Sequence, residues 1–164
     1  MGPIGHSAIS AGIGAGVWEV AGSPVAGGAA LGVGVLTDVD HLFDFYQWYV
    51  RCKQGKLFLF FHAWEYGIAG LLALLFLFYD PIFLAIVLAH LGHVATDQFH
   101  NGLDTRSYFI TYRVLIRFDA VRITGNDNVH YTYTVWPGLL PFGERLRPWY
   151  ERKIEPWFRS RLND

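Results

Sequence analysis

Residues 88–100 decide the fold, because an apolar run that begins at Pro81 ends there in a row of polar side chains. The stretch reads Leu88–Ala89–His90–Leu91–Gly92–His93–Val94–Ala95–Thr96–Asp97–Gln98–Phe99–His100. Its three histidines and its aspartate follow one another at steps of three, four and three residues. On a helix of 3.6 residues per turn, those steps place all four on one face. The stretch predicts an apolar helix with a polar stripe at its end.

This polar stripe predicts a metal site. Three imidazoles and one carboxylate are costly to bury in apolar surroundings unless partners compensate them. A metal ion is a partner that suits imidazole and carboxylate together. The alternative is a stripe satisfied by other side chains or by water. We favour the metal because four such groups are aligned.

The composition indicates a single domain that is partly solvated by lipid. Of the 164 residues, 52% are hydrophobic, 17% aromatic and only 16% charged, whereas about 25% are charged in ordinary soluble domains. The net charge of −1 gives no reason to expect nucleic acid as a partner, and no obligate protein partner is evident. Cys52 is the one cysteine, which excludes an internal disulfide and a cysteine-only zinc site.

Four apolar segments predict an all-α integral membrane bundle of about four helices over residues 1–102. Ser7–Leu36 is rich in glycine and is divided by Ser23–Pro24, which indicates two short, closely packed helices. Leu57–Tyr79 is an apolar run of 23 residues, long enough to span a bilayer. A fourth helix is expected from Pro81 to about His100.

The positive charges indicate an orientation. All 13 lysines and arginines lie in residues 51–56 or 106–161. With four spans, both regions fall on the same side, which the positive-inside rule makes cytoplasmic. We therefore expect the chain in the inner membrane of the cell, with both termini cytoplasmic and membrane lipids as its surroundings.

Residues 103–164 form a basic, aromatic extension that we expect to be cytoplasmic or interfacial. A helix is predicted over Tyr108–Phe118. Val121–Thr124 and Val129–Val135 could pair as a β-hairpin around the turn between them. Phe142–Leu162 mixes arginines with aromatic residues, which suits amphipathic helices on an anionic membrane surface; its two prolines, Pro148 and Pro156, should break it into pieces.

The predicted topology brings several polar clusters to one end of the bundle. In an up-down-up-down arrangement, the clusters before the first helix, after the second, at the start of the third and at the end of the fourth all meet at the cytoplasmic end. The candidate metal ligands are His6, Asp38, Asp40, His41, His62, Glu65, His90, His93, Asp97 and His100. Alternatively, Asp38 and Asp40 cap a following helix, and His62 and Glu65 form a hydrogen-bonded pair on one helix face.

This number of candidate ligands predicts two or three ions, since one zinc takes three or four protein ligands. Zinc fits mixed imidazole and carboxylate ligation; iron and manganese are alternatives. Clustered ions activate water and hold the oxygens of a phosphoester, so no side chain is predicted as the nucleophile. Arg106 and Arg113 could hold a phosphate, or equally bind lipid headgroups.

The ordered motifs resemble a known family. His6, Asp38–Val39–Asp40–His41, His62 and His93–Val94–Ala95–Thr96–Asp97 are similar to the motifs of membrane-bound metal-dependent hydrolases, including the LexA-binding inner-membrane hydrolase-like proteins. They are more distantly similar to those of zinc-dependent phospholipase C and the S1/P1 nucleases. The resemblance covers about residues 1–102, and it departs at Thr37, where the family tends to have proline. It implies hydrolysis of a phosphoester, such as a phospholipid, at the membrane face.

We therefore expect a metal-dependent, membrane-bound hydrolase of phosphoesters that uses metal-activated water. One alternative is a membrane di-iron enzyme that oxidises acyl chains, although those enzymes use about eight imidazoles and this chain has seven histidines. Another is a metal-binding membrane protein without catalysis. The metal content distinguishes the first alternative from the hydrolase.

Overall fold

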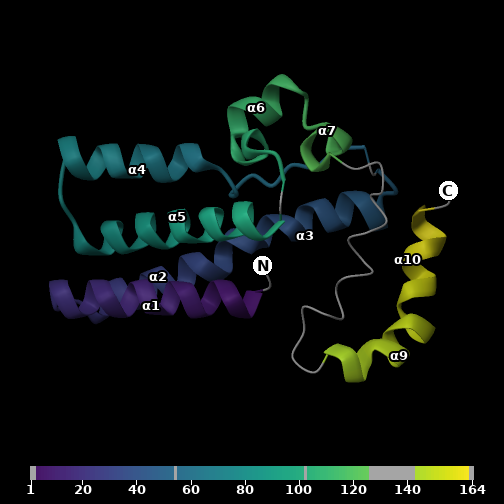
Figure 1. The fold of residues 1–164 in the computed structure, drawn as a ribbon, viewed down its shortest axis with the longest axis horizontal. Coiled ribbons are helices and arrows are strands. Elements are labelled where there is room, and N and C mark those ends of the chain that lie inside the picture. The colour runs from purple at the N-terminus through teal and green to yellow at the C-terminus, as the bar shows by residue number, and fades with distance from the viewer. Residues whose placement is uncertain (1–2, 54, 102, 126–142, 163–164) are drawn as a thin grey trace.

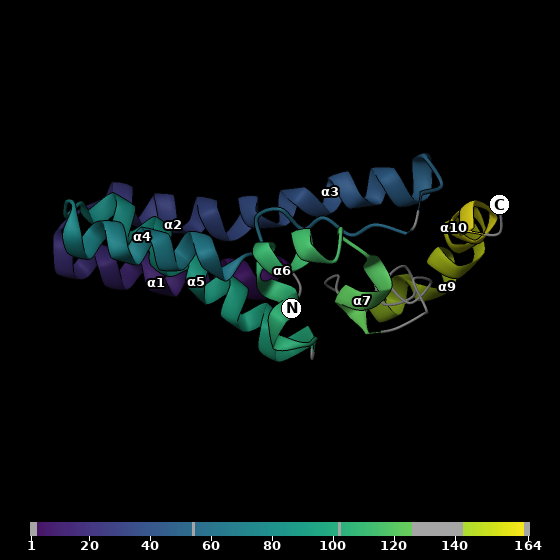
Figure 2. The same ribbon diagram turned by 90° about the horizontal axis from the view of Figure 1, so that it is seen from above.

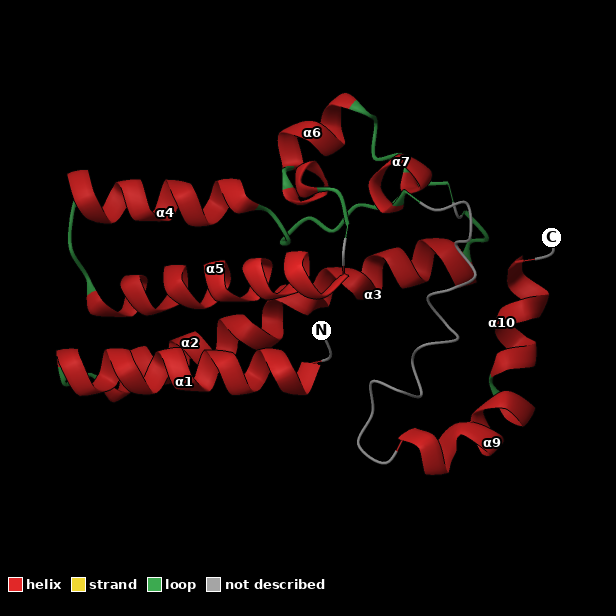
Figure 3. Cartoon of the chain, viewed as in Figure 1, coloured by secondary structure: helices red, strands yellow, loops and turns green. Residues whose placement is uncertain are grey.

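The computed structural model describes residues 3–53, 55–101, 103–125 and 143–162, and the regular structure in these ranges is helical, without a strand (Figure 3). The helices are α1 (Pro3–Ala21), α2 (Pro24–Leu36), η1 (Thr37–Val39), α3 (Asp40–Phe45), η2 (Tyr46–Val50), α4 (Trp64–Phe76), α5 (Pro81–Asn101), η3 (Thr105–Tyr108), α6 (Ile110–Leu115), α7 (Ala120–Thr124), α9 (Gly143–Lys153) and α10 (Glu155–Leu162). The predicted all-α class is confirmed.

Helices α1, α2, α4 and α5 form a bundle at one end of the molecule (Figure 1). α2 packs against α1 and α5, α1 also contacts α5, and α4 packs on α5. The bundle core consists of small side chains, namely Val17, Ala26, Ala30, Ala85 and Ala89. Glycine lets α1 and α2 approach closely, because a Cβ at Gly14 would lie 2.7 Å from the carbonyl oxygen of Gly27.

The bundle helices differ in length from four full membrane spans. Among the described residues, α5 is the one helix that is long and apolar enough to cross a membrane, with 21 residues. α2 and α4 have 13 residues each, which is about 20 Å of helix against a hydrocarbon core of about 30 Å. The third helix was also predicted too long at both ends. The observed helix, α4, begins at Trp64 rather than Leu57 and ends at Phe76 rather than Tyr79.

A nearly straight helical rod carries the chain out of the bundle. α2 runs into the 3-10 turn η1, then α3, and then the π-helix η2, and the residues at each junction keep right-handed helical dihedral angles (Figure 2). Asp38, Asp40 and His41 therefore lie on this rod, just beyond the bundle. The cap of α3 is Val39, which makes no side-chain capping bond, so the structure gives no support to helix capping by Asp38 or Asp40.

A second core lies at the other end of the rod. This aromatic core consists of Trp48, Tyr49, Leu57, Leu59, Ala120, Ile123, Tyr150 and Phe158. This core brings together residues from η2, α7, α9 and α10 and from the segment that contains Leu57 and Leu59. These parts are far apart in the sequence. Phe158 packs edge-on against the ring of Tyr49 with the centroids 4.6 Å apart.

The extension differs from the prediction in three places. The predicted helix over residues 108–118 is split by the extended residue Phe109 and survives as α6. The first predicted strand of the hairpin is wrong: α7 forms there because the Asp119 carboxylate accepts from the backbone N–H of Arg122 and Gly125 ends the helix in the left-handed region. The second strand, residues 129–135, lies outside the described residues.

The two prolines of the last region behave differently from each other. α9 continues through Pro148, so the predicted break there is wrong. The chain instead breaks at Ile154, between α9 and α10, and Pro156 occupies the first turn of α10, where a missing backbone N–H costs no hydrogen bond.

Candidate metal centre

Six of the ten candidate ligands meet where the start of α1, the rod and the end of α5 come together (Figures 1 and 2). They form two groups in which the ligand atoms all lie within 4.8 Å of one another. The first group is His6, Asp38, His93 and Asp97, and the second is Asp38, His41 and His62. Because Asp38 belongs to both groups, the two are contiguous.

The distances between the ligand atoms fit a metal. His62 Nε2 lies 3.2 Å from His93 Nε2, 3.3 Å from Asp38 Oδ1 and 3.4 Å from Asp97 Oδ2. His93 Nε2 lies 3.3 Å from the same Asp38 oxygen. Ligands at about 2.0–2.1 Å from a tetrahedral zinc are about 3.3–3.4 Å from one another. The spacing therefore corresponds to the edges of a zinc coordination shell.

Partners behind the rings fix which nitrogen faces the centre. Nδ1 of His62 lies 3.1 Å from Asp40 Oδ2, and Nδ1 of His93 lies 3.2 Å from the carbonyl oxygen of Gly34. Both partners are acceptors, so in each ring Nδ1 carries the hydrogen and the neutral ring presents a lone pair at Nε2. Two lone pairs at 3.2 Å repel each other unless a proton or a cation lies between them.

The electrostatics of the cluster favour positive charge at this point. Burial alone would lower the pKa of His62, but hydrogen bonds with Asp38, Asp40 and Asp97 hold it well above its usual value. Burial raises the pKa of Asp38, yet its hydrogen bonds with His62 and His93 outweigh this and hold it well below the usual range. The carboxylates thus remain ionised, and a proton or a metal cation compensates them.

His6 is buried beside His93 and Asp97. Its side chain is 1% exposed, and its ring stacks on that of His93 with centroids 3.8 Å apart. Nε2 pairs with Asp97 Oδ1 at 2.9 Å, whereas Nδ1 has no hydrogen-bond partner within the described parts of the chain. Because Nε2 and this carboxylate face each other, both could be ligands of one metal ion.

The two groups differ in their access to solvent. His6, His93 and Asp97 have side chains that are at most 5% exposed. In contrast, the side chain of His41 is 52% exposed and that of Asp38 is 21% exposed. Three of the four residues of the first group are therefore buried, whereas the second group is exposed to solvent at His41 and Asp38. Catalytic zinc sites keep such an open side, and structural sites do not.

The remaining four candidate ligands have other contacts. Asp40 lies behind His62 rather than at the centre. The Glu65 carboxylate accepts from the backbone N–H groups of Ile110 and Thr111, at 3.0 and 2.9 Å, and so caps α6. Nε2 of His90 lies 2.8 Å from the Phe61 carbonyl oxygen, and His100 is exposed at the end of α5. Glu65 and His62 are not on one helix face, because α4 begins after His62.

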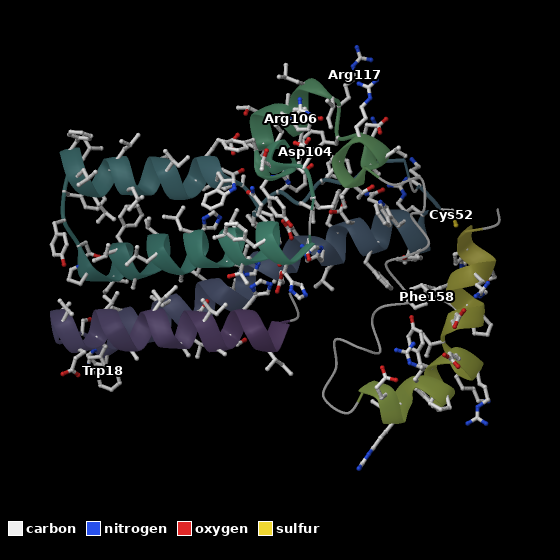
Figure 4. All side chains as sticks on the ribbon, viewed as in Figure 1. Trp18, Cys52, Asp104, Arg106, Arg117 and Phe158 are labelled. Atoms are coloured by element: carbon white, nitrogen blue, oxygen red, sulfur yellow. The ribbon has the colours of Figure 1, made fainter. Side chains whose placement is uncertain are left out.

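The two candidate phosphate-binding arginines are also occupied elsewhere. Arg113 is completely buried, and its guanidinium donates to backbone carbonyls. Arg106 is exposed and forms an ion pair with Asp104 at 3.0 Å, at the surface of η3 (Figure 4). Of the six clustered residues, Arg113 contacts His62, at its backbone carbonyl and not at its imidazole.

Two residues that support the site were not predicted. Asp44 lies one helical turn after Asp40, and its carboxylate accepts from the backbone N–H groups of Phe58 and Leu59 at 2.9 and 3.0 Å. The spacing of four from Asp40 could have indicated it. Gly34 contributes only a carbonyl oxygen, for which a sequence carries no signal.

No protein-family model, curated protein or solved structure matches this chain. The resemblance to membrane-bound hydrolases therefore depends on the motif residues alone.

Proposed function

We propose that the chain is a metal-dependent hydrolase of phosphoesters with zinc as its metal. The observation that carries the proposal is the meeting of four imidazoles and two carboxylates in two contiguous groups, in each of which the ligand atoms all lie within 4.8 Å of one another. The imidazole and carboxylate ligands suit zinc, and Asp38 is shared between two groups. We therefore propose that the two groups would hold two ions, with Asp38 available as a ligand in both groups.

The residues of the two groups would have different tasks. A bound zinc lowers the pKa of coordinated water and polarises a phosphoryl oxygen. His6, His93 and Asp97 would hold one ion among buried side chains. His41 and His62 would hold the other at the solvent-exposed side, where a substrate would arrive. Asp40 keeps the hydrogen on Nδ1 of His62, so that Nε2 is available as a ligand.

We further propose that the bundle is embedded in the inner membrane, with both termini in the cytoplasm. α5 is long and apolar enough to span. α4 and the turn after it expose large apolar side chains, including Leu72 at 50%, Leu75 at 73% and Phe76 at 78%. Because the candidate site is at the end of the bundle, the headgroup phosphoester of a phospholipid would be within its reach.

Elemental analysis tests the proposal. The protein, purified in mild detergent, is compared with His93→Ala and Asp97→Ala variants, and with His100→Ala as a control on the same helix. We expect two zinc ions per chain, fewer in the first two variants and an unchanged number in the control, followed by zinc-dependent release of phosphate or headgroup from phosphomonoesters or phospholipid vesicles. Absence of metal after reloading would refute the proposal, and two irons per chain would favour the oxidative alternative.

A further inference from the structure

Residues 57–63 hold His62 in place without any regular secondary structure. They link the rod to α4, and their backbone groups are bound mainly by side chains. Asp44 accepts from the N–H groups of Phe58 and Leu59, and Asp40 accepts from that of Phe61 at 2.7 Å. Three N–H groups of this segment are thus held by the same rod that carries Asp38 and His41.

Arg113 holds the carbonyl groups of the same segment. One terminal nitrogen of its guanidinium donates to Phe58, at 2.8 Å, and to Leu59; the other donates to the carbonyl of His62 itself. The side chain is 0% exposed, and no carboxylate in the described ranges lies within ion-pair distance of it. Burying a cation without an ion-pair partner costs free energy, and here backbone carbonyls are the compensation.

α6, which carries Arg113, is itself fastened to the bundle. The Glu65 carboxylate on α4 accepts from two backbone N–H groups at the start of α6 and from the hydroxyl of Thr111 at 2.8 Å. α6 therefore has two attachments. Its first residues bind Glu65 on α4, and its Arg113 binds carbonyl groups of residues 57–63. The guanidinium cannot shift without moving His62 or breaking these contacts.

We propose that Arg113 is a positioning residue of the metal centre. By binding the backbone carbonyl of His62, Arg113 fixes the position and orientation of the His62 imidazole. The inference rests on the proposed metal site. The inference extends the proposed metal site because Arg113 touches no ligand atom and lies on α6, outside the bundle. Loss of Arg113 should weaken the group that contains His62 while the group that contains His93 and Asp97 persists.

Cobalt(II) substitution tests this inference, because its visible absorption reports the number and geometry of the ligands. Arg113→Met removes the donors but keeps an unbranched side chain, and Arg113→Lys keeps the charge but cannot span three carbonyls. Arg106→Met is the matched control, an exposed arginine seven residues earlier. His62→Ala supplies the spectrum expected when His62 no longer binds. Affinity is measured by competition with a chelator.

We expect Arg113→Met to bind the more weakly held ion about ten- to a hundredfold less tightly, as is usual when partners of ligands are lost. Its cobalt spectrum should approach that of His62→Ala. Arg113→Lys should show a smaller change in the same direction, and Arg106→Met none.

A folded Arg113→Met or Arg113→Lys protein with the affinity and spectrum of the wild type would overturn the inference while leaving the metal centre intact. If Arg113→Met does not fold, Arg113→Lys decides alone. A wild-type protein that binds no cobalt or zinc would overturn the proposed function and this inference together.

Discussion

The bundle core and the aromatic core of this chain are built in opposite ways. The bundle core contains four alanines and one valine, and its helices expose large side chains such as Leu72 and Phe76. The aromatic core buries Trp48, Tyr49 and Phe158, and the helices that cover it, α9 and α10, expose arginines and glutamates. The first region has its small residues inside and its large apolar residues outside; the second has the reverse.

This difference indicates the solvent that surrounds each region. In water, burial of large apolar side chains drives folding. In lipid, an outward leucine costs nothing, and helices associate through close contact of small residues. The two cores of one short chain are thus what we expect if the bundle is embedded in lipid and the aromatic core is in water. The candidate metal centre lies between them.

The largest expected effect concerns the aromatic core. Phe158→Ala removes a ring that is 2% exposed, and we expect a loss of about 3–5 kcal/mol in the free energy of unfolding. Thermal and chemical unfolding in detergent measures it, with Trp149→Ala, at a site that is 53% exposed, as the control. The metal content should not change; equal losses in both variants would contradict the assigned core.

The second effect tests whether the bundle faces lipid. Leu72→Arg places a charge on an exposed position of α4, and near the middle of a bilayer this costs about 2.5–3.5 kcal/mol. Leu146→Arg on α9, where the leucine is 44% exposed, should stay within about 0.5 kcal/mol of the wild type. Two quantities are measured for each variant: the fraction of protein that stays in the membrane after an alkaline wash, and the free energy of unfolding in lipid. Equal tolerance of both changes would contradict a lipid-facing α4.

The third effect concerns the small residues of the bundle. Gly14→Ala would bring a Cβ to 2.7 Å from the Gly27 carbonyl oxygen, so α1 and α2 must separate at a cost of about 1–3 kcal/mol. Gly16→Ala meets no atom within 4 Å and should instead stabilise α1 by about 1 kcal/mol. Both are measured by thermal unfolding. Effects of the same sign would mean that close packing does not limit the bundle.

The sequence predicted the bundle and the meeting of the polar clusters because both depend on local patterns. The stripe on α5 was predicted from helical periodicity, but the centre occupies one level of the bundle, so His93 and Asp97 face it whereas His90 and His100 do not. The late start of α4 was not predictable, because Leu57–Phe61 is as apolar as the helix that follows. Its conformation depends on Asp44 and on Arg113, which is more than 50 residues away in the sequence.

The last expected effect is the pH dependence of the metal centre, which lies between the two regions. The pKa of His62 is raised in the folded chain, so without metal its protonation stabilises the fold fully below the unfolded value of about 6.5, and this contribution is lost as the pH rises through the folded pKa. Zinc needs the neutral imidazole, so the stabilisation by zinc should grow over the same pH range. Below the folded pKa of His62, the affinity for zinc should decrease about tenfold, or about 1.4 kcal/mol, for each unit by which the pH is lowered. Melting curves with zinc and with chelator, from pH 6 to 9, should therefore diverge as the pH rises. Parallel curves would show that zinc does not displace a proton from His62 and would contradict His62 as a ligand.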